Sequence, residues 1–329
     1  MCPVPAAVTV VHLRQPPPHA RLDEAMLQLE FRAMGCHMSV VLDADERHTS
    51  PLNQVPAWFE EWEQHLSRFR ANSELNQLNR RAGHWLRTSS MLWEVIQLAL
   101  EAAQWSDGLV SPTLLNALEA AGYDRSFDAI EAVNDGRSIV PMPDGQWRSI
   151  KRRTLLRSIQ LPINARLDLG GVAKGWAADR AAQRLSLYGP TLVDAGGDIA
   201  LSGPQADGQL WPIGVSDPLH PDRQLELLMV PRGGIATSGR DYRRWKRNGV
   251  WQHHIIDPRT GLPAQTDVLS ATVIASSAYQ AEVAAKVMLI SGSETGLKWI
   301  EARPDFAALI VLEDSRVLYS SRMAELLWR

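Results

Sequence analysis

A pair of glycines between an acid and a lysine is the first feature of this sequence that could do chemistry. Asp168 and Lys174 flank Gly170 and Gly171 in the segment LDLGGVAKGW (167–176), where we expect a strand, a tight turn and the start of a helix. Free amides and the positive end of a helix favour a phosphate, and Lys174 would add a full charge. The spacing matches neither GxxxxGK(S/T) nor GxGxxG, which excludes the usual nucleotide-binding loops. A structural turn with a surface lysine explains the segment equally well.

A second glycine pair is also flanked by acids, in the segment VDAGGDI (193–199). Gly196 and Gly197 permit a positive φ or a close approach of the backbone, and neither requires a ligand. The simplest interpretation of this segment is therefore a structural turn.

A histidine and an aspartate lie close together in the segment HHIIDPRTGLP (253–263), which follows ATSGRDY (236–242). His254 ends a predicted strand, and Asp257 follows three residues later. Either side chain could accept a proton in a group-transfer reaction. A lone histidine is more often a structural residue, and Asp-Pro-x-Thr-Gly is a favourable turn sequence by itself.

Glu282 and Lys286 stand four residues apart in the segment AYQAEVAAK (278–286), which is predicted to be helical. The glutamate precedes the lysine, which is the favourable order for an ion pair along one helix face. Without further context, this pattern predicts an exposed pair worth about 0.3–0.5 kcal/mol.

These residues must be positioned by helices and strands that the apolar periodicity predicts. Helices are expected at 56–66, 91–105, 172–187, 278–290 and 293–302, with a serine-capped turn at 73–76. Strands are expected at 27–43 (broken at Met34-Gly35), 166–169, 191–202, 210–216, 225–230, 249–257, 268–276 and 305–312. Because strands and helices do not alternate strictly, we predict an α+β fold with mixed or antiparallel sheets.

The composition excludes several classes of protein. The net charge is −3, from 34 Lys+Arg against 37 Asp+Glu, which argues against a dedicated nucleic-acid-binding protein. The two cysteines cannot form a disulfide framework or a zinc site. No apolar run reaches about 18 residues, so we expect no membrane span. Residues 1–26 are predicted to be a flexible leader that is a poor match to a signal peptide, residues 27–329 the folded domain, and the cytoplasm the location.

Taken together and in this order, the segments resemble the ApbE family of FAD:protein FMN transferases. Two further segments carry the resemblance: RAMG (32–35), and SRFR (67–70) leading into SELN (73–76). The resemblance extends from about residue 29 to about residue 313, which is nearly the whole chain apart from the leader.

The resemblance implies an α+β, ApbE-type (T-fold-like) fold whose two intertwined subdomains hold FAD in a cleft. Such an enzyme cleaves FAD, attaches FMN through a phosphoester to a threonine of an acceptor flavoprotein, and releases AMP. It also implies a set of residues that contact FAD or line its cleft: Met34, Phe69, Gly122, Tyr123, Asp124, Asp168, Lys174, Ile256, Glu282 and Lys286. The catalytic candidates are His254 or Asp257 as general base, and Lys174 for the developing charge.

Three departures from the family pattern stand out. The family usually binds Mg²⁺ through an Asp and a Thr of the late helix and a backbone carbonyl at the position of Gly171. Here Glu282 and Lys286 replace that pair, and a lysine has no acceptor with which to ligate a cation. Gly171 and Glu282 are therefore candidate metal ligands only if Lys286 does not take the place of the metal. Phe69 lacks the hydroxyl of the usual tyrosine, and no lipoprotein signal is visible.

Two other functions remain open at this stage. The chain could be a non-catalytic FAD-binding protein, or an FAD pyrophosphatase in which water replaces the threonine. The sequence contains nothing that identifies the acceptor protein.

Overall fold

The computed structural model describes residues 26–132, 136, 138–143 and 145–328. The leader predicted for residues 1–26 lies outside the described residues except for Met26, which begins the first strand. The division into a leader and one domain over 27–329 stays a prediction.

The largest sheet in the described part of the chain has eight strands, each antiparallel to its neighbours. Its strand order is β1 (Met26–Ala33), β2 (Cys36–Asp43), β6 (Thr191–Ala195), β7 (Asp198–Leu201), β10 (Gly233–Gly239), β15 (Val268–Ala275), β16 (Ala307–Leu312) and β17 (Val317–Tyr319). Strands β6, β7 and β16 are buried along their whole length, because other layers cover both faces of the sheet.

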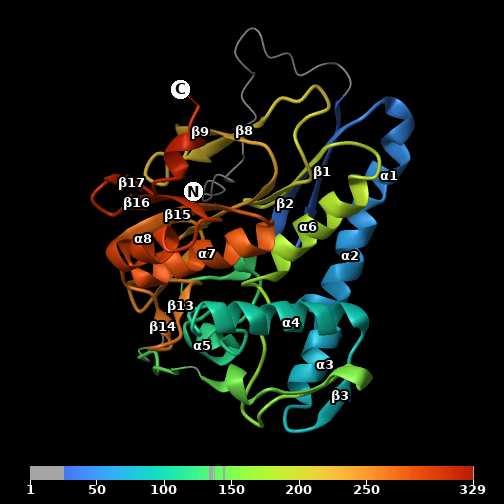
Figure 1. The fold of residues 1–329 in the computed structure, drawn as a ribbon. Coiled ribbons are helices and arrows are strands. Elements are labelled where there is room, and N and C mark those ends of the chain that lie inside the picture. The colour runs from blue at the N-terminus through green and yellow to red at the C-terminus, as the bar shows by residue number, and fades with distance from the viewer. Residues whose placement is uncertain (1–25, 133–135, 137, 144, 329) are drawn as a thin grey trace.

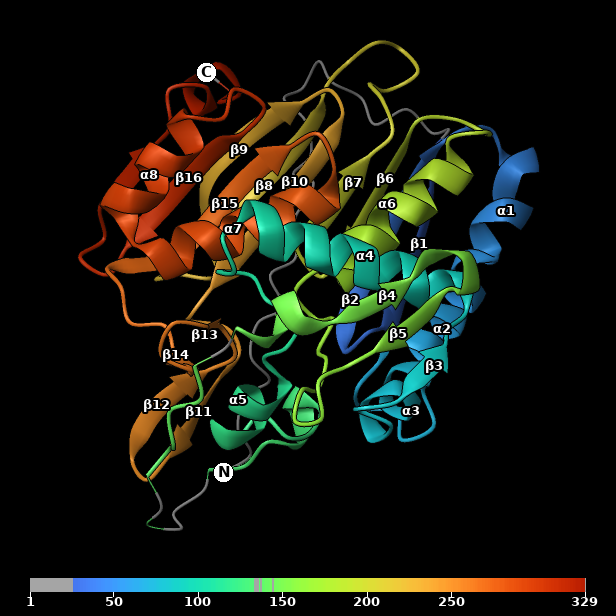
Figure 2. The same cartoon turned by 60° about the horizontal axis from the view of Figure 1, so that its bottom comes forward.

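Helices cover one face of this sheet and a hairpin covers the other (Figure 1, Figure 2). Helices α6 (Ala173–Leu185) and α7 (Ala278–Ser291) pack on β6, β7, β10 and β15, and α8 (Ser293–Glu301) follows α7. The hairpin of β8 (Trp211–Ser216) and β9 (Gln224–Val230) packs on the other face. The alternation of β2 shows the two sides, since Val40 joins the core near α6 whereas Val41 joins the core under the hairpin.

The segment between β2 and α6 adds a second body of helices, which begins with α1 beside β1 and continues below the sheet in Figure 1. Its helices are α1 (Thr49–Asn53), α2 (Val55–Leu66), α3 (Glu74–Arg80), α4 (Ser90–Trp105) and α5 (Leu115–Ala120). Its small sheet has the order β3 (Trp85–Arg87), β5 (Ser158–Gln160), β4 (Lys151–Arg153). Short 3₁₀ turns occur at Glu46–His48, Phe127–Ala129, Gln146–Ser149, Thr154–Leu156 and Met323–Glu325.

Two short hairpins follow β10 in the chain. They are formed by β11 (Arg244–Arg247) with β12 (Val250–His253), and by β13 (Ile256–Asp257) with β14 (Leu262–Pro263). Asn248 and Gly249 join β11 to β12 with φ angles of 50° and 77°, the positive pair typical of a tight two-residue hairpin turn.

Local sequence explains where several helices begin. The Ser73 hydroxyl accepts a hydrogen bond from the Asn76 N–H at the start of α3, and Ser89 caps α4 in the same way. Helix α7 is apolar on nearly every side because it lies between the sheet and the helices around it.

The structure confirms the predicted α+β class and most of the predicted elements, but it corrects three predicted strands and adds elements that were not predicted, among them α1, α5, β10 and β11. Residues 166–169 are not a strand. The range 191–202 is two strands separated by the turn at Gly196-Gly197, and 249–257 is also two strands, β12 and β13. Strand β10, in the middle of the large sheet, was missed because its sequence GGIATSG lacks the apolar alternation of a typical strand.

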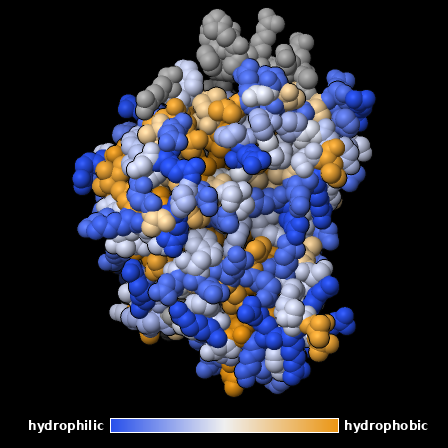
Figure 3. All heavy atoms as spheres, viewed as in Figure 1, coloured by the Kyte–Doolittle hydropathy of each residue, from blue (hydrophilic) through white to orange (hydrophobic). Residues whose placement is uncertain are grey.

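The face of the molecule seen in Figure 1 is mostly hydrophilic, with hydrophobic side chains scattered or in small groups (Figure 3). In the described part of the chain, no helix combines the length and apolar character needed to cross a bilayer.

Candidate active site

A cavity of about 350 Å³, called the pocket below, opens between the helix layer of the large sheet and the body that contains α2 and α5. Its wall is built by the β1–β2 turn, the loops after α2 and α4, the turn before α6, α7, and the residues around the β11–β12 hairpin. The pocket is lined by nine of the residues predicted for the site: Met34, Phe69, Tyr123, Asp168, Gly171, Lys174, His254, Ile256 and Lys286.

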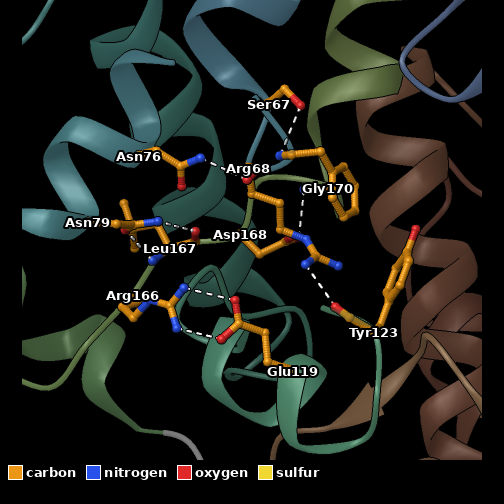
Figure 4. Close-up of polar contacts among 11 residues, drawn as sticks. Ser67, Arg68, Asn76, Asn79, Glu119, Tyr123, Arg166, Leu167, Asp168 and Gly170 are labelled. Atoms are coloured by element: carbon orange, nitrogen blue, oxygen red, sulfur yellow. Dashed lines mark hydrogen bonds and ion pairs between the residues drawn. The ribbon is translucent and has the colours of Figure 1, made fainter. Parts of the chain in front are cut away.

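Arg68 joins two sides of the pocket wall (Figure 4). Its Nε lies 2.7 Å from a carboxylate oxygen of Asp168, and its Nη1 donates to the Tyr123 carbonyl at 2.8 Å. The guanidinium lies over the rings of Phe69 and Tyr123, 4.1 and 4.5 Å from their centroids. Only 5% of the side chain is exposed, and the buried Nη2 has no partner in the described part of the chain. One end of the pocket therefore combines two aromatic rings with a cation.

Side chains fix the backbone before α6, which is why residues 166–169 are not a strand (Figure 4). The Asn79 side chain accepts from the Leu167 N–H at 2.7 Å and donates to the Leu167 carbonyl at 2.9 Å, replacing a strand partner. The Asp168 carboxylate accepts from the Gly170 N–H at 2.8 Å, which closes the glycine turn. Asp168 thus holds both the turn and Arg68.

The other end of the pocket contains four charged side chains in contact. Lys174, in the first turn of α6, pairs with Asp198, and its Nζ lies 3.5 Å from Glu282 Oε1. Lys286 Nζ lies 3.0 Å from the same Oε1. The other oxygen of Glu282 accepts from the Gly175 N–H at 2.9 Å. Glu282 is fully buried behind the two lysines, whereas Lys174 and Lys286 line the pocket.

The pKa shifts in this cluster follow from burial and from the opposing charges. Burial alone would raise the pKa of Glu282, but the ammonium groups of Lys286 and Lys174 outweigh it and lower that pKa below its ordinary value. Burial lowers the pKa of Lys174, and the charge of Glu282 opposes this shift. Because two carboxylates surround its ammonium, we infer that Lys174 is charged at neutral pH.

His254 lies in the pocket wall directly after β12. Its ring meets the ring of Tyr123 edge to face, with the centroids 6.3 Å apart, and its buried Nδ1 has no partner among the described residues. Burial lowers its pKa well below the ordinary value, and the positive charge of Arg243 adds to this shift. His254 is therefore a neutral imidazole with a free ring nitrogen.

Four predicted site residues do not line the pocket. Asp257 faces Arg259, with Oδ2 and Nη2 2.8 Å apart, and closes the following turn by accepting from backbone N–H groups. Asp124 pairs with Arg125 on the surface, at 2.8 Å. Gly122 has a φ of 103° and packs against Trp245. Glu282 is buried and contacts both lysines that line the pocket.

Sequence reasoning gave no role to Arg68, Asp198 or Arg243, although Arg68 and Arg243 line the pocket. Arg68 belongs to the SRFR segment, so its position could have indicated a role. The signal for Asp198 was weak, because an acid after two glycines is also typical of an ordinary turn. Arg243, whose Nη2 lies 2.8 Å from Cys36 Sγ, follows no sequence pattern.

The described residues contain no group of three or more His, Cys, Asp and Glu side chains arranged to hold a metal ion. Glu282 and Asp198 each contact an ammonium in this cluster. A Cβ built on Gly171 would lie 3.9 Å from Lys286 Cε, so the lysine side chain occupies the space beside this glycine. The donor set fits an ammonium and does not fit a divalent cation.

Comparison with known proteins decides the family. The family model described as "ApbE family" matches residues 34–310. The chain belongs to the ApbE family.

Curated relatives and solved structures agree with this membership. The FAD:protein FMN transferase of Treponema pallidum is 30% identical over 308 residues, which cover 86% of this chain and 82% of the relative. That of Vibrio cholerae is 30% identical over 271 residues, 79% of each chain. The structure of an ApbE protein from Thermotoga maritima matches 92% of this chain and 100% of its own, with a TM-score of 0.84 and 24% identity. The predicted ApbE-type fold is thereby confirmed.

The burial of His254 makes a prediction about its protonation. We expect the His254 ring to be neutral at pH 6.5 and above, because burial and the charge of Arg243 disfavour the imidazolium. Histidines of the unfolded chain titrate near pH 6.5, so His254 lowers the stability of the fold as the pH falls below that value.

The measurement is an NMR titration of the His254 Hε1 resonance from pH 5 to 8, assigned by its loss in His254→Gln. The urea-unfolded protein gives the reference midpoint. A His254 midpoint at or above that of the unfolded protein would contradict the prediction.

Proposed function

We propose that this protein is an FAD:protein FMN transferase, which cleaves FAD and attaches FMN through a phosphoester to a threonine of an acceptor flavoprotein. The pocket of this ApbE-family chain carries the proposal, because aromatic rings lie at one end and two lysines lie at the other. A flavin ring would stack at the first end, and the pyrophosphate would lie near Lys174 and Lys286. The names of the Treponema and Vibrio relatives support the same activity.

In the proposed reaction, the threonine hydroxyl oxygen attacks the phosphorus on the FMN side of the pyrophosphate. The bond from this phosphorus to the bridging oxygen breaks, and AMP leaves with the electron pair. The threonine proton passes to a general base, for which we propose His254, since its neutral ring lines the pocket. Asp257, the sequence-based alternative, is held by Arg259 and lies outside the pocket lining.

Charge on the pyrophosphate oxygens increases as this bond breaks, and fixed cations stabilise it. Each lysine ammonium has three donors. Among the described residues, the polar contacts of Lys286 are with the Glu282 carboxylate at 3.0 Å and the Glu282 carbonyl at 3.4 Å, and those of Lys174 are with Asp198 and Glu282. We propose that each directs a remaining N–H to the substrate. The carboxylates hold both ammonium groups in place before FAD arrives.

We further propose that no Mg²⁺ takes part. The Lys286 side chain lies beside Gly171 and its ammonium contacts Glu282, the two positions from which a metal would have been held. It repels a divalent cation and supplies positive charge of its own, as a point charge without fixed coordination geometry.

A flavinylation assay tests the proposed function. Purified protein is incubated with FAD and a panel of threonine-containing peptides, and the products are followed by chromatography and mass spectrometry. We expect AMP to be released together with a peptide that carries FMN. FMN and AMP without any modified peptide would indicate a pyrophosphatase, and intact FAD would indicate a binding protein.

Lys174 gives a prediction about FAD affinity. Hydrogen bonds to charged groups contribute about 1.5–3 kcal/mol, so we expect Lys174→Ala to weaken FAD binding about ten-fold to a hundred-fold. Fluorescence titration measures the dissociation constant. Because this change also leaves Asp198 unpaired, the control is Lys174→Ala with Asp198→Asn. If the double variant binds FAD like the wild type, the phosphate role of Lys174 is wrong.

Lys286 gives a prediction about metal dependence. We expect EDTA to leave FAD affinity and FMN transfer of the wild type unchanged, and Glu282→Asp with Lys286→Thr to create a requirement for Mg²⁺. Mg²⁺ binding is measured directly by calorimetry, and activity in parallel. Lys298→Thr, which removes the same charge from an exposed pair with Glu294 on α8, is the matched control. Activity of the wild type that disappears with EDTA and returns with Mg²⁺ would overturn the prediction.

A further inference from the structure

The β11–β12 hairpin is fixed to the pocket wall at both of its ends. Arg243 precedes β11 and His254 follows β12, and both residues line the pocket. Trp245 anchors the base: it is buried, its ring lies 5.6 Å from that of Tyr123, and its Nε1 donates to the Ala121 carbonyl at 3.0 Å. Figure 2 shows the hairpin projecting from the body of the molecule. The hairpin is therefore attached directly to the pocket wall.

In the middle of the hairpin, the side chains alternate between a buried and an outward face. Trp245 and Gln252 oppose one another on the buried face. Lys246 and Trp251 oppose one another on the outward face, and Arg244 is also exposed there. Trp251 is 53% exposed, which is a large apolar area to leave in water.

Both basic side chains of the outward face lie against Trp251. The Arg244 guanidinium carbon is 4.6 Å from the centroid of the Trp251 ring, and Lys246 Nζ is 5.1 Å from it. No described carboxylate forms an ion pair with either residue. Asp241 lies nearby: burial raises the pKa of its carboxyl group, and the charge of Arg244 opposes this shift. The chain as a whole has a net charge of −3, so this concentration of positive charge is local.

We propose that the outward face of this hairpin binds an acidic segment of the acceptor protein and so guides its hydroxyl into the pocket. The inference rests on the proposed function, in which a second protein must bring a threonine to the pocket. Two cations that form no ion pair with a described carboxylate, placed on an exposed indole, match carboxylates, and an aromatic surface adds contact area. A strand of four residues extends about 13 Å, so the acidic residues of an extended segment would lie within about five residues of the threonine.

The experiment measures peptide binding by fluorescence anisotropy, independently of the reaction. One peptide has a single central threonine and Asp or Glu within five residues on either side, and its counterpart has Asn and Gln at those positions. We expect the wild type to bind the acidic peptide at least ten-fold more tightly at low salt, and the difference to shrink as salt is added.

Charge reversal locates the binding surface. Arg244→Glu with Lys246→Glu should abolish the preference for the acidic peptide while FAD affinity stays unchanged. The matched control is Lys151→Glu with Arg153→Glu on β4, which reverses two exposed charges on a short strand, with Arg153 stacked on Trp85 at 4.1 Å. This control should keep the preference. The salt dependence of the wild type supplies the same test if the hairpin variant does not fold.

Three results would overturn the inference: equal binding of the two peptides, a loss of preference in the β4 control, or hairpin-dependent binding to phosphatidylserine vesicles without a peptide preference. FMN transfer is scored separately. A preferred peptide that is bound but never modified counts against the proposed activity. Transfer without any acidic preference counts against the docking surface alone.

Discussion

The buried carboxylate of Glu282 is the constraint on which the charged end of the pocket depends. A carboxylate without exposure to water is strongly unfavourable unless charges and hydrogen bonds compensate it. Here one oxygen meets the ammonium groups of Lys174 and Lys286, and the other accepts the Gly175 N–H. That N–H belongs to the first turn of α6, where no backbone carbonyl of the helix can accept it. One side chain of α7 thus satisfies the start of α6 and directs two cations to the same wall of the pocket.

The aromatic end of the pocket is organised by a different ion pair. Arg68 and Asp168 join the loop after α2 to the turn before α6, and that turn leads directly into Lys174. The spacing between Arg68 and Lys174 is therefore set by a few residues of chain held at both ends. A substrate with a planar ring and a pyrophosphate matches this division into two chemically distinct ends.

Much of the site could be predicted from sequence because its chemistry lies in contiguous segments. The glycine turn, the lysine that follows it and the Glu282–Lys286 spacing are local patterns, and the structure places both lysines in the pocket. The spacing alone predicted that Glu282 and Lys286 would form an exposed pair. That prediction is wrong, because burial depends on what packs against α7. Asp198 and Arg243 could not be found in this way, because their roles arise from contacts between distant segments. Strand β10 was missed because glycines occupy several of its positions. They let other segments of backbone pack closely against the strand, but they interrupt the alternation of apolar side chains from which a strand is predicted.

Helices α6 and α7 satisfy each other's first turns. The Asp179 carboxylate of α6 accepts from the Ala278 and Tyr279 N–H groups at the start of α7, at 2.9 and 3.0 Å, and Glu282 of α7 returns the contact to Gly175. A Cβ on Gly175 would lie 2.7 Å from the backbone of α7, so the close approach requires glycine. Gly175, Asp179 and Glu282 thus form one structural unit that joins the two helices. The approach of α6 to α7, and with it the spacing of Lys174 and Lys286, therefore depends on residues that do not themselves line the pocket.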